Sequence, residues 1–237
     1  MSGRLYKYLV MSALIAATSC DEGRLYDKEV IVTGEGGNAR VTATVTGADS
    51  WTEGYTLAVA GFEDGNEFAL ISKNIGTLDA DGKCDVVLTG IPAEVSTVEL
   101  CAIDRLRRRV ATFASAPYTA GSDTVRITAS ETNLSMSAAI QQEIFNTTCT
   151  QCHGGSNYAA AGLHLTDGVS FAEMISVPSV KVNGKNRVEP GSSSQSVLFM
   201  ILEGDTSAEW NYDHSVEVVR QEKLDLIRNW IDGGAKL

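Results

Sequence analysis

Arg40-Val41-Thr42-Ala43-Thr44-Val45-Thr46 alternates polar and apolar side chains residue by residue. In an extended strand, this period of two places the valines and the alanine on one face and the arginine and threonines on the other. Comparable runs follow at 55–62, 67–72, 84–88, 97–103, 109–114 and 124–128. Turn signals such as Asp64-Gly65 and Asp81-Gly82 separate several of them, so the first half of the chain is predicted to be all-β.

About seven or eight short strands at this spacing are typical of an immunoglobulin-like sandwich. The pattern changes near residue 130, where a polar, linker-like stretch precedes helical spacing that begins at Ala138. Further helices are expected at 171–175, 196–202 and 220–232, and Gly233-Gly234 supplies the stop of the last one. We therefore expect a β-sandwich domain at 21–130 and an all-α domain at 131–237.

Acidic residues outnumber basic ones. The 237-residue chain has 30 Asp and Glu against 19 Lys and Arg, a formal net charge of −11. Phosphate binding needs clustered Lys and Arg, and the one dense basic run, at 105–109, is short. We expect no nucleic-acid partner.

The first twenty residues are typical of an export signal, because Arg4 and Lys7 precede an apolar stretch at 9–17. That stretch is shorter than the roughly 20 residues that a membrane-spanning helix needs. Ala17-Thr18-Ser19-Cys20 resembles a bacterial lipoprotein box, although Ala stands where Leu is usual, and ordinary cleavage near Ser19 is the alternative. We expect residues 1–20 to be a signal peptide ending at a lipidated Cys20. The exported chain is then anchored to the outer membrane, and Asp21-Glu22 resembles the surface-export signals of some Bacteroidetes lipoproteins, which implies its outer surface.

Cys149-Thr150-Gln151-Cys152-His153 has the spacing of c-type haem attachment. On a helical turn each thiol can add to one porphyrin vinyl group, and the following His can bind the iron. The competing interpretations are a dithiol redox pair and half of a zinc site. A closed zinc site needs four ligands, and no second Cys pair lies nearby; a thioredoxin-like pair needs a βαβ setting that the flanks do not offer. We expect one haem c on Cys149 and Cys152, with His153 as the proximal iron ligand.

Further motifs flank these five residues. They are Ile144-Phe145 before them and Ala161-Gly162-Leu163-His164-Leu165, Val188-Glu189-Pro190-Gly191, Ser196-Val197-Leu198 and 227–235 after them. Together they make residues 144–235 resemble the small cytochrome c domains of the planctomycete type. The resemblance implies a compact helical fold in which the haem-bearing helix packs near the last helix. The fold class expected for the chain is therefore multidomain, an immunoglobulin-like all-β sandwich followed by an all-α cytochrome c domain.

The resembling family commonly has a distal Met before the final helix, whereas the corresponding segment 209–215 holds no Met. His214 is the residue best placed to replace it, and a bis-histidine haem has a lower reduction potential than a His/Met haem. Met200 is the rival, but its apolar helical run favours core packing, and His164 is expected at the surface. An open sixth position is the remaining alternative. Trp210, Tyr212 and Trp230 are expected to be core residues rather than porphyrin contacts.

Cys84 and Cys101 fall in predicted strands, and either a disulfide or two free core thiols fits them. Taken together, the chain is predicted to be an exported, lipid-anchored monohaem cytochrome that exchanges single electrons with a redox partner protein. It is then an electron carrier rather than an enzyme, with peroxidase activity as the lowest-ranked alternative. The alternative from another class is a cell-surface binding or adhesion lipoprotein whose β domain contacts a glycan or a partner near Trp51, Glu53 and Tyr55, with the haem domain auxiliary.

Overall fold

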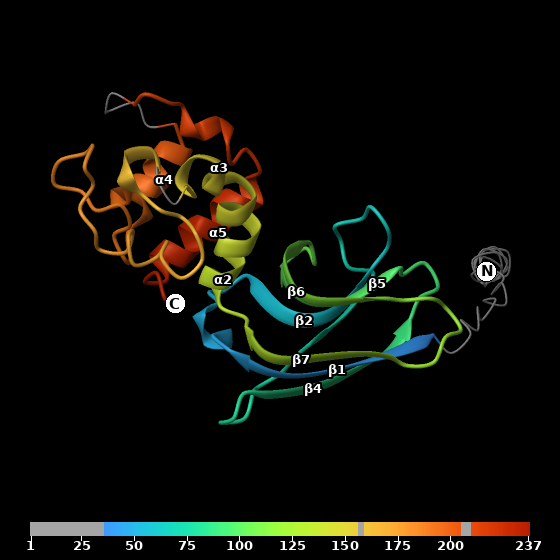
Figure 1. The fold of residues 1–237 in the computed structure, drawn as a ribbon. Helices are drawn as coiled ribbons and strands as arrows, with labels where there is room; N and C mark the ends of the chain where they lie inside the picture. The colour runs from blue at the N-terminus through green and yellow to red at the C-terminus, as the bar shows by residue number, and fades with distance from the viewer. Residues whose placement is uncertain (1–35, 156–158, 205–209) are drawn as a thin grey trace, which may run out of the picture. The chain divides into compact units, whose positions relative to one another are not determined.

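The computed structural model describes residues 36–155, 159–204 and 210–237. The predicted signal peptide and Cys20 lie outside the described residues. Seven strands in the described part of the chain form two sheets (Figure 1). The strands are β1 (Gly37–Thr46), β2 (Tyr55–Phe62), β3 (Ile71–Asn74), β4 (Lys83–Ile91), β5 (Thr97–Asp104), β6 (Arg109–Pro117) and β7 (Val125–Asn133). The described residues belong to one compact unit.

One sheet has the strand order β4-β1-β7 and the other has the order β3-β2-β5-β6. Neighbouring strands are antiparallel except for β1 and β7, which pair in parallel. The two sheets face each other across a shared apolar core, to which Val41 and Leu88 contribute from the first sheet and Val59 and Leu100 from the second. The arrangement is therefore two-layered, and in the second sheet β2 and β5 are buried on both faces.

Strand β1 has the alternation that its sequence predicts. Ala39, Val41, Ala43 and Val45 are buried, and the residues between them are more exposed. On the outer face, Arg40 Nε donates to a carboxylate oxygen of Asp85 on β4 at 2.8 Å. Because the side-chain period of a strand is two, a one-residue slip would expose all four apolar side chains, so the core fixes the register of β1.

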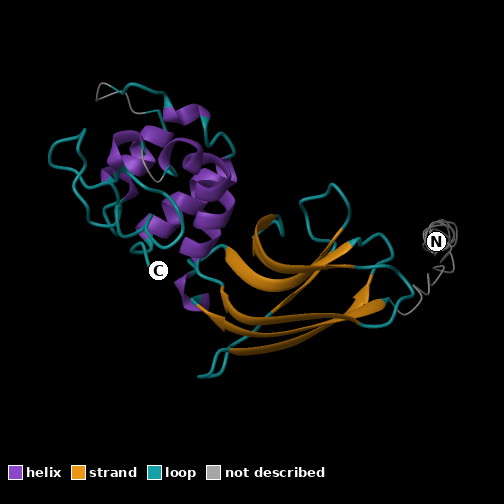
Figure 2. Cartoon of the chain, viewed as in Figure 1, coloured by secondary structure: helices purple, strands orange, loops and turns teal. Residues whose placement is uncertain are grey.

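Apart from the turn η1 between β1 and β2, the helices follow β7 and are short (Figure 2). The longer ones are α2 (Met136–Ile140), the π-helix η2 (Gln141–Cys149), α3 (Thr150–His153), α4 (Val197–Leu202) and α5 (Gln221–Asp232). The remaining ones are single 3-10 turns, η1 (Ala48–Ser50), η3 (Ala160–Gly162), η4 (Ser193–Gln195) and η5 (His214–Val216). The helices predicted at 196–202 and 220–232 are thereby confirmed as α4 and α5.

The predicted fold class, an immunoglobulin-like sandwich followed by an all-α cytochrome c domain, is wrong. The described chain is mostly β-sheet, and only a short helical part lies at its C-terminus. Residues 171–175, expected to be helical, form turns, and isolated β-bridges join Ile175 to Val188 and Pro178 to Asn186. Between the helices the sequence is rich in Gly, Ser, Asn and Pro, which favour turns. Gly184 and Gly191 have φ of 75° and 85°, a conformation that interrupts a helix.

A second apolar core lies beneath these helices. Helix α5 buries Leu226, Ile227, Trp230 and Ile231 on one side, as its sequence spacing predicts. Ile144 and Phe145 of η2 join the same core, and so does Ala111 of β6. The segment that carries the two haem-motif cysteines is therefore packed at its start against the last helix, and strand β6 contributes to the same core.

Candidate functional site

The Cys149–His153 motif lies at the end of a helical run that starts at α2. Ser135 caps the start of this run, because its Oγ accepts the backbone N–H of Ala138 at 3.1 Å. The run continues through the π-helix η2 and ends in α3 at His153. A π-helical stretch is rare and frequently marks a functional site. A Cβ on Gly154 would overlap the carbonyl oxygen of Thr150, so the chain turns away directly after the motif only because a glycine stands there.

The two motif cysteines are free thiols in different surroundings. Cys149 is half-buried and contacts the helical core, whereas Cys152 is exposed. Burial raises the pKa of Cys149 to about 11, and the negative charge of Glu217 adds to this effect. Neither sulfur takes part in a disulfide. Because its pKa is raised, Cys149 is a neutral thiol at pH 7.

His153 is held by a hydrogen bond through its ring nitrogen Nδ1. Its Nδ1 lies 3.2 Å from the carbonyl oxygen of Leu163. A carbonyl oxygen only accepts, so Nδ1 carries the proton and Nε2 keeps its lone pair. Burial lowers the pKa of His153 below its usual range and the charge of His214 also lowers it, while hydrogen bonds to the backbone of Leu163 and Ala160 oppose both. The neutral imidazole is the form that binds a metal.

His214 lies beside His153. It opens the short turn η5, which Asp213 caps by accepting from the backbone N–H of Ser215 at 3.0 Å and from its hydroxyl at 2.6 Å. The ring centres of His153 and His214 are 6.4 Å apart, and their planes differ by 30°. The Nδ1 atom of His214 is buried and has no hydrogen-bond partner among the described residues. A buried ring nitrogen in that state is a group whose bonding capacity is unused.

The two histidines fit a six-coordinate haem iron. Two nitrogen–metal bonds of about 2 Å each, together with the half-width of each ring, place the ring centres roughly 6 Å apart. The observed separation of 6.4 Å agrees with this value. The donor set also fits, since both residues are histidines and Nδ1 of His214 has no hydrogen-bond partner among the described residues. The spacing of the two rings therefore fits the separation expected for two imidazoles on one haem iron.

Tyr212 and Glu217 complete the surroundings of His214. The Tyr212 ring stands edge-on to the His214 ring, and the Tyr212 hydroxyl donates to a carboxylate oxygen of Glu217. This hydrogen bond is the main reason why the pKa of Tyr212 is raised, and the charge on Cys152 contributes. The segment around η5 therefore lies close to the thiols at the end of the helix.

The other residues considered from the sequence lie elsewhere. His164 is half-buried, and its Nδ1 lies 3.1 Å from a carboxylate oxygen of Glu173. Met200 is half-buried on α4 and is not among the residues of the helical core. Trp230 is a core residue, as expected, and Tyr212 is exposed at the surface. Trp210 makes an interaction within the described chain.

Two contributors were missed by the sequence reasoning. The carbonyl of Leu163 carries no side-chain signal, so only the folded chain reveals it. Gln141 is buried, and because Gln142 follows it directly the sequence does not distinguish the buried amide from its exposed neighbour. Neither residue belongs to the five-residue motif.

The cysteines of the β-strands are free thiols rather than a disulfide. Cys84 lies in β4, within the core between the sheets, and Cys101 lies in β5, in a separate apolar cluster. The residues considered for glycan contact are largely engaged: Trp51 Nε1 donates to the carbonyl of Leu134 at 2.5 Å, and Tyr55 OH accepts from Asn229 Nδ2 at 3.0 Å. The polar groups of Trp51 and Tyr55 are therefore hydrogen-bonded within the protein.

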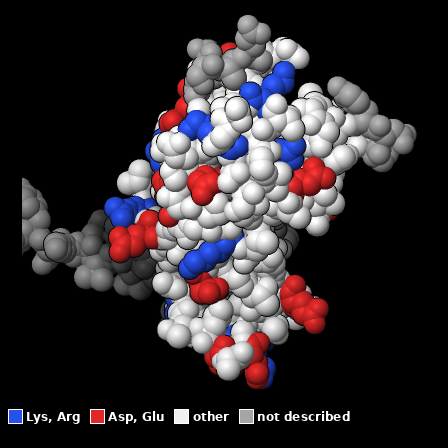
Figure 3. All heavy atoms as spheres, turned by 90° about the vertical axis from the view of Figure 1, so that its left-hand side faces the viewer, with Lys and Arg blue, Asp and Glu red and all other residues white. Residues whose placement is uncertain are grey.

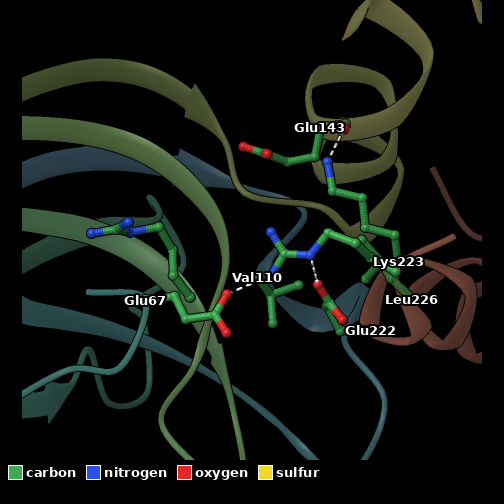
Figure 4. Close-up of a pocket in the computed structure, with 8 residues that line it drawn as sticks. Glu67, Val110, Glu143, Glu222, Lys223 and Leu226 are labelled. Atoms are coloured by element: carbon green, nitrogen blue, oxygen red, sulfur yellow. Dashed lines mark hydrogen bonds and ion pairs between the residues drawn. The ribbon is translucent and has the colours of Figure 1, made fainter. Parts of the chain in front are cut away.

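A cavity of about 140 Å³ lies where β6 approaches α5 (Figure 4). Arg220 pairs there with Glu67 and Glu222, and Lys223 Nζ donates to the carbonyl of Glu143 at 2.5 Å. The charged groups of Arg220, Glu67 and Glu222 therefore pair with one another. On the face drawn in Figure 3, acidic and basic side chains are interspersed rather than gathered in one patch.

Among the described residues, no helix is long and apolar enough to cross a membrane. The same residues contain no group of three or more His, Cys, Asp and Glu side chains placed to hold a metal ion. A haem site does not require such a group, because the porphyrin supplies four of the iron ligands. The chain matches no protein-family model and no curated protein.

Proposed function

We propose that this protein is an exported electron carrier with one haem c, attached through Cys149 and Cys152 and ligated by His153 and His214. The observation that carries the proposal is the pair of imidazoles, 6.4 Å apart, beside two free thiols. The haem supplies a reversible one-electron couple between ferric and ferrous iron. Two nitrogen ligands favour the ferric state more than a His/Met pair does, so the reduction potential is on the low side.

Attachment uses the thiols at the end of the helix. Each S–H adds across one vinyl group: the sulfur bonds to one vinyl carbon, the hydrogen goes to the other, and the C=C bond becomes single. The free state of Cys149 and Cys152 is the state that this addition needs. The exposed side chain of Cys152 gives a first point of attachment, and the partly buried Cys149 is the second.

The histidines have distinct tasks. His153 is held by the Leu163 carbonyl in the tautomer that presents Nε2. His214 is presented by the capped turn η5, and as a second iron ligand it would keep water off the iron. With both sides occupied, outer-sphere transfer to a redox partner protein is favoured over substrate chemistry at the iron.

Export and anchoring are part of the proposal. The motivation is the sequence of residues 1–20, with lipid on Cys20 at the outer membrane. Labelling cells with a radioactive fatty acid should mark the wild-type protein and leave Cys20→Ser unlabelled. Equal labelling of both would overturn the lipid anchor and leave the haem proposal untouched.

Expression of the full chain in cells that mature c-type cytochromes tests attachment. The purified protein should be coloured, keep its haem through acid-solvent extraction and show a mass increase of one haem. The double variant Cys149→Ala/Cys152→Ala should lose covalent haem, whereas Cys84→Ala should retain it. Colourless wild-type protein with both motif thiols free would overturn the proposal.

Distal ligation is tested separately. His214→Ala should convert a low-spin ferric spectrum to a high-spin one while haem stays attached. His164→Ala is the matched control, because that histidine pairs with Glu173 instead, and its spectrum should remain low-spin. An unchanged spectrum of His214→Ala would exclude His214 as the ligand.

A further inference from the structure

Gln141 is a buried amide at the first residue of the π-helix η2, and only 5 % of its surface is exposed. Its Nε2 donates to Asn146 Oδ1 at 2.8 Å and to the carbonyl of Leu165 at 2.9 Å. Its Oε1 accepts from the hydroxyl of buried Ser170 at 2.5 Å. Both N–H groups and the carbonyl are thus bonded, which offsets the cost of burying an amide and fixes its orientation.

The chain segment that Gln141 holds is the segment that holds His153. The backbone N–H of Leu165 donates to the carbonyl of His153 at 2.8 Å. Two residues earlier, the carbonyl of Leu163 accepts from Nδ1 of the same histidine. Residues 163–165 therefore hold His153 by its main chain and its ring, and Gln141 bonds the carbonyl of Leu165 at the end of this segment.

We propose that Gln141 is a positioning residue for His153: through residues 163–165 it sets the length of the Nδ1–H···O=C bond and thereby the reduction potential of the haem. The inference rests on the proposed function. A metal-bound imidazole whose other N–H is hydrogen-bonded is a more basic ligand, and it stabilises the ferric state. Releasing residues 163–165 weakens that bond, so the reduction potential rises.

The variant for the test is Gln141→Met, which keeps the length of the side chain and removes all three hydrogen bonds. Gln142→Met is the matched control: the neighbouring amide is exposed, and its Nε2 donates to the carbonyl of Thr112 at 3.0 Å. Potentiometric titration of the holoprotein should give a higher reduction potential for Gln141→Met and an unchanged one for Gln142→Met. Equal potentials in Gln141→Met and wild type, with haem retained, would overturn the inference.

A second readout separates positioning from general loosening. In a His214→Ala background the reduced iron keeps His153 as its one protein ligand, and resonance Raman spectroscopy reports the iron–histidine stretch. That frequency should fall when Gln141→Met is added, because a less basic imidazole binds less strongly. A frequency that does not move would assign Gln141 a purely structural role and refute the proposal.

Ser170→Ala is the milder variant if Gln141→Met fails to fold. It removes the bond to Gln141 Oε1 and leaves the donation to Leu165 in place, so the rise in potential should have the same direction and a smaller size. If Gln141→Met does not fold and Ser170→Ala leaves the reduction potential unchanged, the proposal is refuted. Wild-type protein without covalent haem would contradict the proposed function itself, and that outcome is distinct from all of these.

Discussion

The ring of Tyr212 stands edge-on to the ring of His214, with the centres 5.3 Å apart and the planes at 88°. The Tyr212 hydroxyl is tied to Glu217 on the far side of the turn η5, so the tyrosine spans the turn that presents the histidine. Tyr212 is half-exposed, and its contact with His214 is not explained by core packing. The contact therefore holds the ring of His214 in place on the distal side of the proposed haem site.

Removing the Tyr212 ring should loosen His214. An edge-to-face pair contributes about 0.5–1.5 kcal/mol, so Tyr212→Ala should raise the affinity of the ferric haem for cyanide roughly 2- to 10-fold, because cyanide competes with the distal histidine. Tyr212→Phe keeps the ring and should stay near the wild-type affinity. Equal gains in both variants would show that the hydroxyl bond to Glu217, and not the ring, supports His214.

The two motif thiols should react at different rates in the haem-free protein. With a pKa of about 11, Cys149 is roughly one part in a thousand thiolate at pH 8, and it is half-buried. Iodoacetamide should therefore label the exposed Cys152 roughly tenfold faster or more, as followed by peptide mass spectrometry. Because the folded pKa of Cys149 is raised, its rate should climb with pH up to about 11. Matching rates at pH 8 would contradict the described burial, and haem-loaded protein should label at neither position.

Strands such as β1 and β4 were predictable because one buried face leaves a period of two in the sequence, and β2, buried on both faces, was predictable as a short apolar run between turn signals. Residues 55–62 were predicted as a strand and form β2 with those bounds, and 220–232 differs from α5 by one residue. The parallel pairing of β1 with β7 was not readable, since pairing depends on where the chain returns and not on local pattern. The seven strands of the described chain were therefore easier to locate than to order.

The sequence led to the prediction of too much helix in the second half of the chain. The apolar residues Phe171, Met174 and Ile175 suggested a helix, yet they reach the core from turns. Short apolar runs do not distinguish a helix from a turn that buries the same side chains. The residues of the candidate site could be named from the sequence, because the spacing of Cys149, Cys152 and His153 is itself the signal and His214 is the one histidine of its segment. The hydrogen bond from His153 to a main-chain carbonyl leaves no trace in the sequence.

The turn before β4 should be sensitive to a glycine substitution. Gly82 has φ of 69°, and a Cβ there would overlap the carbonyl oxygen of Val45, whose backbone N–H donates to the Gly82 carbonyl at 2.8 Å. Gly82→Ala should lower the free energy of unfolding by about 3 kcal/mol, from left-handed strain plus the overlap. Gly76→Ala is the control, because its φ is 78° but its Cβ position is open, and it should cost about 1 kcal/mol. Urea unfolding measures both, and equal losses would rule out the overlap with Val45.

Trp230 should be the strongest single anchor of the helical core. Its side chain is 1 % exposed, its ring meets Phe171 edge-on at 5.3 Å, and its Nε1 donates to the carbonyl of Lys236 at 2.8 Å. Trp230→Ala should cost about 3–5 kcal/mol in the urea unfolding of haem-free protein, because it leaves a large cavity.

Trp230→Phe separates packing from the hydrogen bond of Trp230. It retains a ring against Phe171 and frees the Lys236 carbonyl, so the loss should be smaller, about 1–2 kcal/mol. Val219→Ala removes apolar atoms that are 73 % exposed and should change the free energy of unfolding by less than about 0.5 kcal/mol. A loss in Trp230→Ala no larger than that of Val219→Ala would place the indole outside the core. A full loss in Trp230→Phe would instead assign most of the stabilisation to the indole N–H and the shape of the larger ring.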